Sequence, residues 1–104
     1  MSPPDGPSPA LAAALEGELD RLLARIAPAL AADRVPPLPR PRLRFFQHRL
    51  DAGRALAAEL PGEPGTIELN TVYLEREGWD SAIATLGHEL AHLVVFHRYP
   101  RRRV

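Results

Sequence analysis

The residues of this sequence best suited to chemistry lie together in the segment His88-Glu89-Leu90-Ala91-His92. Four residues advance an α-helix by about 400°, so the two imidazoles would stand one turn apart on one face and could bind one divalent metal ion. Glu89 would lie about 100° around the helix, close enough to accept a proton from a water that the metal activates. The metal would also polarise a scissile carbonyl, and Glu89 would return the proton to the leaving amine. The pattern predicts metal-assisted peptide hydrolysis.

A second interpretation of the two histidines stays open, in which backbone or carboxylate partners satisfy them near a core and no ion binds. The surroundings favour the metal. The motif falls inside a predicted amphipathic helix, preceded by Ala84-Thr85-Leu86-Gly87 and followed by Leu93-Val94-Val95. A metal-binding helix that is buried on one side requires such flanks.

Spacing does not identify a third metal ligand. The metzincin pattern places a Gly and a third His three and six residues after the second His, and Val95 and Arg98 stand there instead, which excludes that class. His97 would lie about 140° from His92 on a continuing helix, so we expect a surface or capping histidine rather than a ligand. The upstream residues with suitable chemistry but no supporting spacing are His48, Glu68 and Glu75.

The segments before the motif must supply its scaffold. Ser8 and Pro9 predict the start of an amphipathic helix over about residues 9–32, which Pro28 ends near Ala27 or kinks. The Pro-rich residues 35–41 must be extended. Three short segments then have strand-like features: Leu43–Leu50, Gly53–Leu60 and Thr66–Leu74.

The assignment leaves one conflict at residues 54–60, and it predicts how the last helix begins and ends. The Ala, Leu, Glu and Arg of residues 54–60 favour a helix by composition, which conflicts with a strand there. Asp80 or Ser81 is expected to cap the last helix after Gly78, and Pro100 is expected to stop it.

Composition limits the possible classes. The chain has 104 residues, no cysteine, and 13 acidic side chains against 13 arginines. Disulfide scaffolds, thiolate metal sites and cysteine proteases are therefore excluded. The Pro- and Gly-rich start predicts a loose tail over residues 1–8, and the length predicts a single domain over residues 9–104. With no apparent leader or membrane span, we expect a soluble, cytoplasmic protein that does not insert into membranes.

Three blocks of the sequence resemble the SprT-like family of zinc metallopeptidases, over about residues 35–100. They are Arg49-Leu50-Asp51-Ala52-Gly53-Arg54-Ala55, then Thr66-Ile67-Glu68-Leu69-Asn70 with Leu74, then the metal helix from Ala84 to Val95. The resemblance implies that His88 and His92 bind zinc and that Glu89 is the general base, acting on a protein or peptide substrate. It also implies a strand rather than a helix at residues 54–60. The expected fold is α+β and zincin-like, with an N-terminal helix, a small three-stranded sheet and the metal helix.

In SprT-like proteins the third ligand is typically a His in a His-Gly context beyond the second His. The sequence ends at Val104, at or just before that point. We therefore expect a domain that is incomplete at its C-terminus, with a two-histidine site that holds zinc weakly. An alternative is a catalytically inactive relic that serves as a DNA-associated or protein-binding module. A purely structural metal site is a further alternative.

DNA association is raised by the resemblance, because some SprT-like proteins are DNA-dependent proteases. Between residues 34 and 54 only Asp51 opposes a run of basic residues. Their simplest interpretation is as solvated surface side chains of a neutral protein, and a weak DNA-binding side is the alternative. They are Arg34, Arg40, Arg42, Arg44, Arg49 and Arg54.

Overall fold

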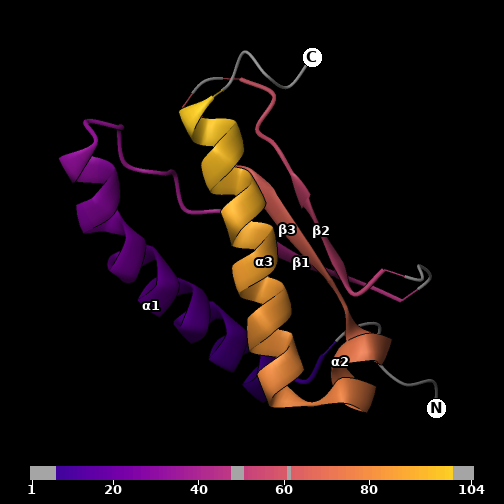
Figure 1. Ribbon diagram of the computed structural model, residues 1–104. Coiled ribbons are helices and arrows are strands. Elements are labelled where there is room, and N and C mark those ends of the chain that lie inside the picture. The colour runs from indigo at the N-terminus through magenta and orange to yellow at the C-terminus, as the bar shows by residue number, and fades with distance from the viewer. Residues whose placement is uncertain (1–6, 48–50, 61, 100–104) are drawn as a thin grey trace.

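Three helices and three strands make up the part of the chain that the computed structural model describes, which is residues 7–47, 51–60 and 62–99 (Figure 1). Their order confirms the predicted α+β class. In sequence they are α1 (Pro9–Ala32), β1 (Arg42–Phe46), β2 (Gly53–Leu56), β3 (Thr66–Asn70), α2 (Thr71–Glu77) and α3 (Trp79–Arg98).

Helix α1 begins where the sequence predicts. The Ser8 side chain accepts a hydrogen bond from the Leu11 backbone N–H at 3.1 Å, and Pro9 occupies the first turn. The predicted span of residues 9–32 is confirmed, and of the two alternatives for Pro28 the one that ends the helix near Ala27 is wrong. Proline removes one backbone hydrogen bond, and this stretch of α1 is exposed, so water can satisfy the carbonyl left free.

The sheet is mixed, with strand order β1-β3-β2. Strand β1 runs parallel to the central strand β3, and β2 runs antiparallel to it. Ile67 and Leu69 of β3 are fully buried, as the alternation of apolar and polar residues predicts. Residues 54–56 are in a strand despite their helical composition, because pairing with β3 overrides propensity. Residues 57–60, which were predicted to continue that strand, have no regular structure.

The prediction that the third strand continues to Leu74 is wrong, because Asn70 ends it and starts α2. The Asn70 side-chain oxygen accepts hydrogen bonds from the backbone N–H groups of Val72 and Tyr73, at 3.0 and 3.4 Å. Its amide nitrogen donates to the Asp51 carbonyl at 3.1 Å. One buried side chain therefore caps a helix and also fastens the segment that leads into β2.

Helix α3 starts one residue before the predicted caps. Gly78 stands at its N-cap with φ 90°, and no side chain caps the helix. Asp80 lies inside the first turn instead, where a negative charge favours the helix dipole. The helix buries a stripe of residues that includes Leu86, Leu90 and Leu93. It ends at Arg98, and the predicted stop at Pro100 lies outside the described residues.

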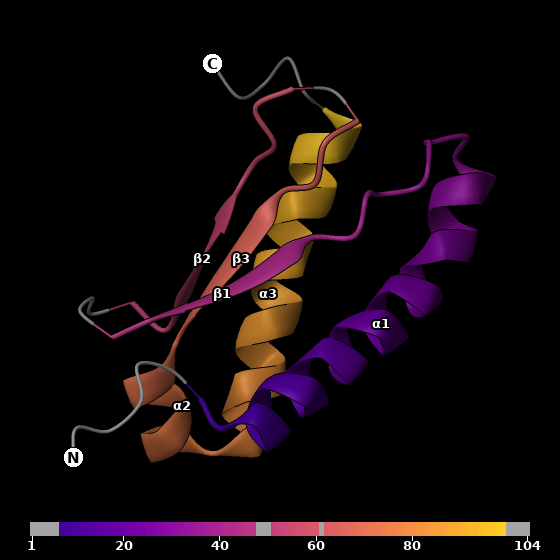
Figure 2. The same cartoon turned by 180° about the vertical axis from the view of Figure 1, so that it is seen from behind.

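The long helices lie on one side of the sheet. Helix α3 packs across β2 and β3, and α1 lies beside α3, which leaves the other face of the sheet without a helix over it among the described residues (Figure 2). Leu15 and Leu19 of α1 join the β3 and α3 side chains in one core. No helix in the described ranges is both long and apolar enough to cross a bilayer.

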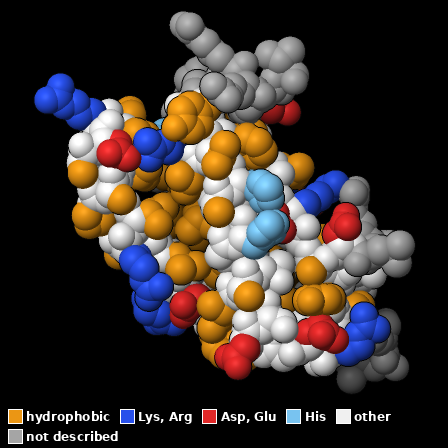
Figure 3. Space-filling model, viewed as in Figure 1, with side chains coloured by type: hydrophobic (Ala, Val, Ile, Leu, Met, Phe, Trp, Pro, Cys, Tyr) orange, Lys and Arg blue, Asp and Glu red, His pale blue; other side chains and the backbone are white. Residues whose placement is uncertain are grey.

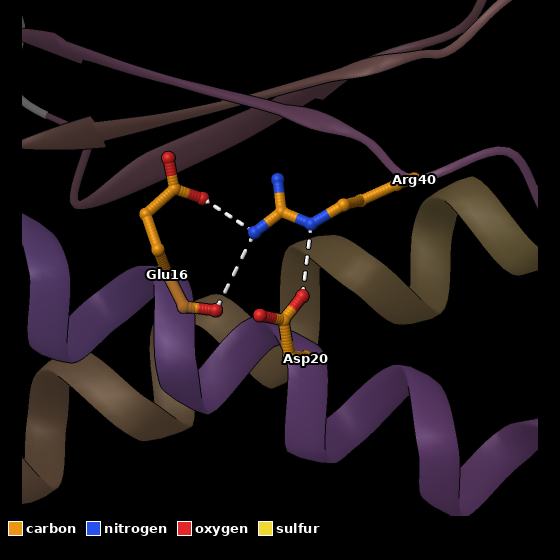
Figure 4. A network of polar contacts seen from close by, with 3 residues as sticks. All are labelled: Glu16, Asp20 and Arg40. Atoms are coloured by element: carbon orange, nitrogen blue, oxygen red, sulfur yellow. Dashed lines mark hydrogen bonds and ion pairs between the residues drawn. The ribbon is translucent and has the colours of Figure 1, made fainter.

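An ion-pair network fastens the extended segment before β1 to α1 (Figure 4). The Arg40 guanidinium donates to the carboxylates of Asp20 and Glu16, each at 2.8 Å. The hydrogen bond to Asp20, followed by that to Glu16, raises the pKa of Arg40. As the prolines predict, residues 35–41 have no regular structure. These ion pairs hold Arg40 against α1, two residues before β1 begins.

Replacing Asn70 by Ala should destabilise the fold by about 1 to 3 kcal/mol, because it removes the α2 cap and the bond to the Asp51 carbonyl from a site that is 4% exposed. The matched control is Ser8→Ala, which removes one exposed cap and should cost about 0.5 to 1 kcal/mol. Urea unfolding of both variants measures the difference. Equal losses would show that Asn70 acts as an ordinary helix cap only.

Candidate metal centre

His88 and His92 project from the exposed face of α3, where histidine side chains form the pale-blue patch over this helix in Figure 3. Their Nε2 atoms are 3.2 Å apart, and their ring centroids are 4.7 Å apart with the planes at 89°. The two rings converge because four residues bring the helix back to almost the same direction. The predicted one-turn pair is therefore present as a pair of neighbouring imidazoles.

Glu89 differs from the two histidines in its burial. It is 7% exposed, because one residue of helix turns it from the open face toward the sheet. One of its carboxylate oxygens belongs to a group with a nitrogen of each histidine, and all of these atoms lie within 4.8 Å of one another. The three residues thus combine two accessible nitrogen donors with one shielded carboxylate.

The carboxylate lies at the edge of an open cavity of about 310 Å³ between α3 and the start of β2. Its walls are Asp51, Ala52, Gly53, Ala84, Thr85, His88 and Glu89. Gly53 permits the close approach of helix and strand. A Cβ there would lie 2.9 Å from the Glu68 carbonyl oxygen and 3.0 Å from the Thr85 methyl carbon, so a larger residue would push the elements apart.

The donor set fits a divalent metal. Imidazole nitrogens at about 2.0 to 2.1 Å from a tetrahedral zinc ion stand about 3.3 Å apart. The observed 3.2 Å between the Nε2 atoms agrees with that spacing without any movement of the helix. His88 and His92 would hold the ion, and the carboxylate beside them would remain free to accept a proton.

The other residues considered as ligands do not join this group in the described part of the chain. Glu68 pairs with Arg54 on β2, and Glu75 is exposed on α2. His97 points elsewhere, as its helical angle predicts, and its Nε2 donates to the Pro36 carbonyl at 2.7 Å. His48 lies outside the described residues.

Sequence reasoning missed the role of Phe96. Its ring stacks on that of His92, with centroids 6.4 Å apart and the planes at 24°. The signal was present in the spacing, since Phe96 follows His92 by four residues on the same helix. Phe96 is therefore a neighbour of the candidate metal ligand His92 on the same helix face.

Comparison with known proteins identifies the family of this chain. The model of the SprT-like family matches residues 21–104, which include the second half of α1, the three strands, α2 and the whole of α3. This chain belongs to the SprT-like family. No curated protein and no solved structure matches it. As a SprT-like protein, it carries the His88, Glu89 and His92 group as a candidate metal centre.

We expect His88→Ala and His92→Ala to weaken zinc binding at least tenfold, because each removes one of two converging nitrogen donors. Competition with a chromophoric chelator measures the affinity. His97→Ala is the matched control, since it removes an imidazole of the same helix that bonds to a backbone carbonyl. Equal zinc affinity in all four proteins would place the metal elsewhere.

Proposed function

We propose that this SprT-like protein is a zinc-dependent metallopeptidase that hydrolyses peptide bonds in protein or peptide substrates. The observation that carries the proposal is the pairing of two exposed imidazoles, 3.2 Å apart, with the shielded carboxylate of Glu89 on the same helix. Family membership supports the same chemistry. The cavity beside Glu89 offers space for a substrate carbonyl and a water next to these groups.

A zinc ion held by the two histidines would supply a Lewis acid that polarises the carbonyl and lowers the pKa of the attacking water. Glu89 accepts the proton of that water as the water attacks, and then donates it to the leaving amine nitrogen. Because Glu89 is 7% exposed, little solvent competes for the proton during this transfer. The Phe96 ring stacks on that of His92 beside these groups.

Glu89→Gln should retain zinc binding and lose at least a hundredfold in the rate of peptide hydrolysis, because the amide keeps the shape of the side chain but cannot accept the proton. Cleavage of a quenched fluorescent peptide by the zinc-loaded protein measures the rate. Glu75→Gln on the exposed surface of α2 is the control. Hydrolysis that survives in Glu89→Gln, or its absence from the parent protein, would refute the proposal.

A second candidate function is weak association with DNA, and the position of three arginines favours it. Arg44 and Arg54 both lie opposite Glu68 in the strand register, and Arg42 lies two residues from Arg44. Because side chains alternate along a strand, the three arginines share the face of the sheet that no described helix covers (Figure 2). Only Glu68 opposes them in these three strands.

The variant Arg42→Ala/Arg44→Ala should lower the slope of log affinity against log salt by about 2 for a short DNA duplex, because each phosphate contact contributes about 0.9. Arg21→Ala/Arg25→Ala, which removes two exposed arginines of α1, is the control with the same change in charge. Fluorescence anisotropy over a salt series provides the affinities. Equal slopes for the two variants would remove this second function.

A further inference from the structure

A second cavity, of about 370 Å³, lies at the other end of β2. Its walls come from the segment before β1, the residues after β2, and the last turns of α3. Most of its lining is apolar, and includes Leu38, Ala57, Leu60, Leu93 and Phe96. Leu60 is 59% exposed, so the cavity opens to solvent.

The prolines explain why the wall formed by residues 36–39 is apolar. Three of these four residues are proline, which has no backbone N–H to satisfy. The hydrogen bond from His97 Nε2 to the Pro36 carbonyl, at 2.7 Å, fastens this wall to α3. Gly65 forms the floor, where a Cβ would lie 2.9 Å from both the Leu56 carbonyl oxygen and a Leu93 methyl carbon. The proline wall and the floor of the cavity are therefore both held against α3.

The two cavities follow one another along α3, with the smaller one at His88 and the larger one past His92. His88 and Glu89 line the smaller one, whereas Leu93, Phe96 and His97 line the larger one. Phe96 lies between the larger cavity and the candidate metal centre, because it lines the cavity and its ring also stacks on His92. Phe96 and His97 follow His92 by four and five residues, which is a rise of about 6 to 7.5 Å along the helix axis. An extended peptide covers that distance with about two or three residues.

We propose that this cavity receives a large apolar side chain of the peptide substrate, about two or three residues from the scissile bond. The inference rests on the proposed peptidase function and adds the substrate class to it. The volume lies within the range of about 300 to 1,000 Å³ that is typical of ligand sites. The His97 ring nitrogen is already bonded to Pro36, and the only charged residue among the described lining residues is the exposed Glu63. The mostly apolar walls therefore favour an aromatic or long aliphatic side chain over a polar one.

Peptide binding to zinc-loaded Glu89→Gln tests the inference without relying on turnover. For each position of a labelled peptide, one version would carry Phe and the other Ser. Fluorescence anisotropy would give the affinity of every version. We expect Phe to improve the affinity about tenfold or more at one position only. Ala57→Phe, which fills the cavity, should abolish that preference. Leu60→Ser, at the exposed mouth, should reduce it even if Ala57→Phe fails to fold.

Val72→Ser is the matched control for Leu60→Ser, because Val72 is 50% exposed on α2 and lies outside the cavity. A Phe preference that survives both cavity variants, or no preference at any position, would overturn the inference. So would self-association of the protein that Ala57→Phe or Leu60→Ser disrupts, because a second copy would then be the occupant. Binding with the expected preference but no hydrolysis by the parent protein would refute the peptidase proposal alone.

Discussion

The packing of α3 against β2 and β3 is the interaction on which the rest of this protein depends. Leu86, Leu90 and Leu93 bury one side of the helix in a core shared with the sheet. This burial fixes the rotation of the helix about its axis, so that His88 and His92 face outward and Glu89 faces the strand. The same apolar stripe that stabilises the domain therefore also sets the geometry of the candidate metal centre.

Close approach between helix and sheet is made possible by two glycines. Gly53 lies beside Glu89's cavity and Gly65 lies beneath the larger cavity, and a Cβ at either would press on a backbone oxygen and on an α3 side chain. Asn70 holds the same region from the opposite end, because it joins the end of β3 to the Asp51 carbonyl. The shapes of both cavities along α3 therefore depend on backbone positions that Gly53, Gly65 and Asn70 determine.

Sequence alone predicted the parts governed by local periodicity. The span of α1, the strand character of residues 66–70 and the one-turn spacing of His88 and His92 follow from repeats of 3.6 or two residues. The strand at residues 53–56 was indicated by the family resemblance, against a helical composition. It did not predict α2, because that helix begins through the side-chain cap of Asn70 within a pattern that also suits a strand. The bond of His97 to Pro36 and the place of Phe96 in the wall of the larger cavity depend on which distant segments pack against α3. No local pattern encodes that choice.

If His88 and His92 hold one zinc ion between them, both rings must respond to the same binding event. Nuclear magnetic resonance of the histidine ring protons during a zinc titration measures this response. We expect the ring signals of His88 and His92 to shift together along one saturable binding curve, with the same dissociation constant, while those of His97 stay in place. A titration in which neither ring responds, or in which only one of the two does, would contradict this expectation.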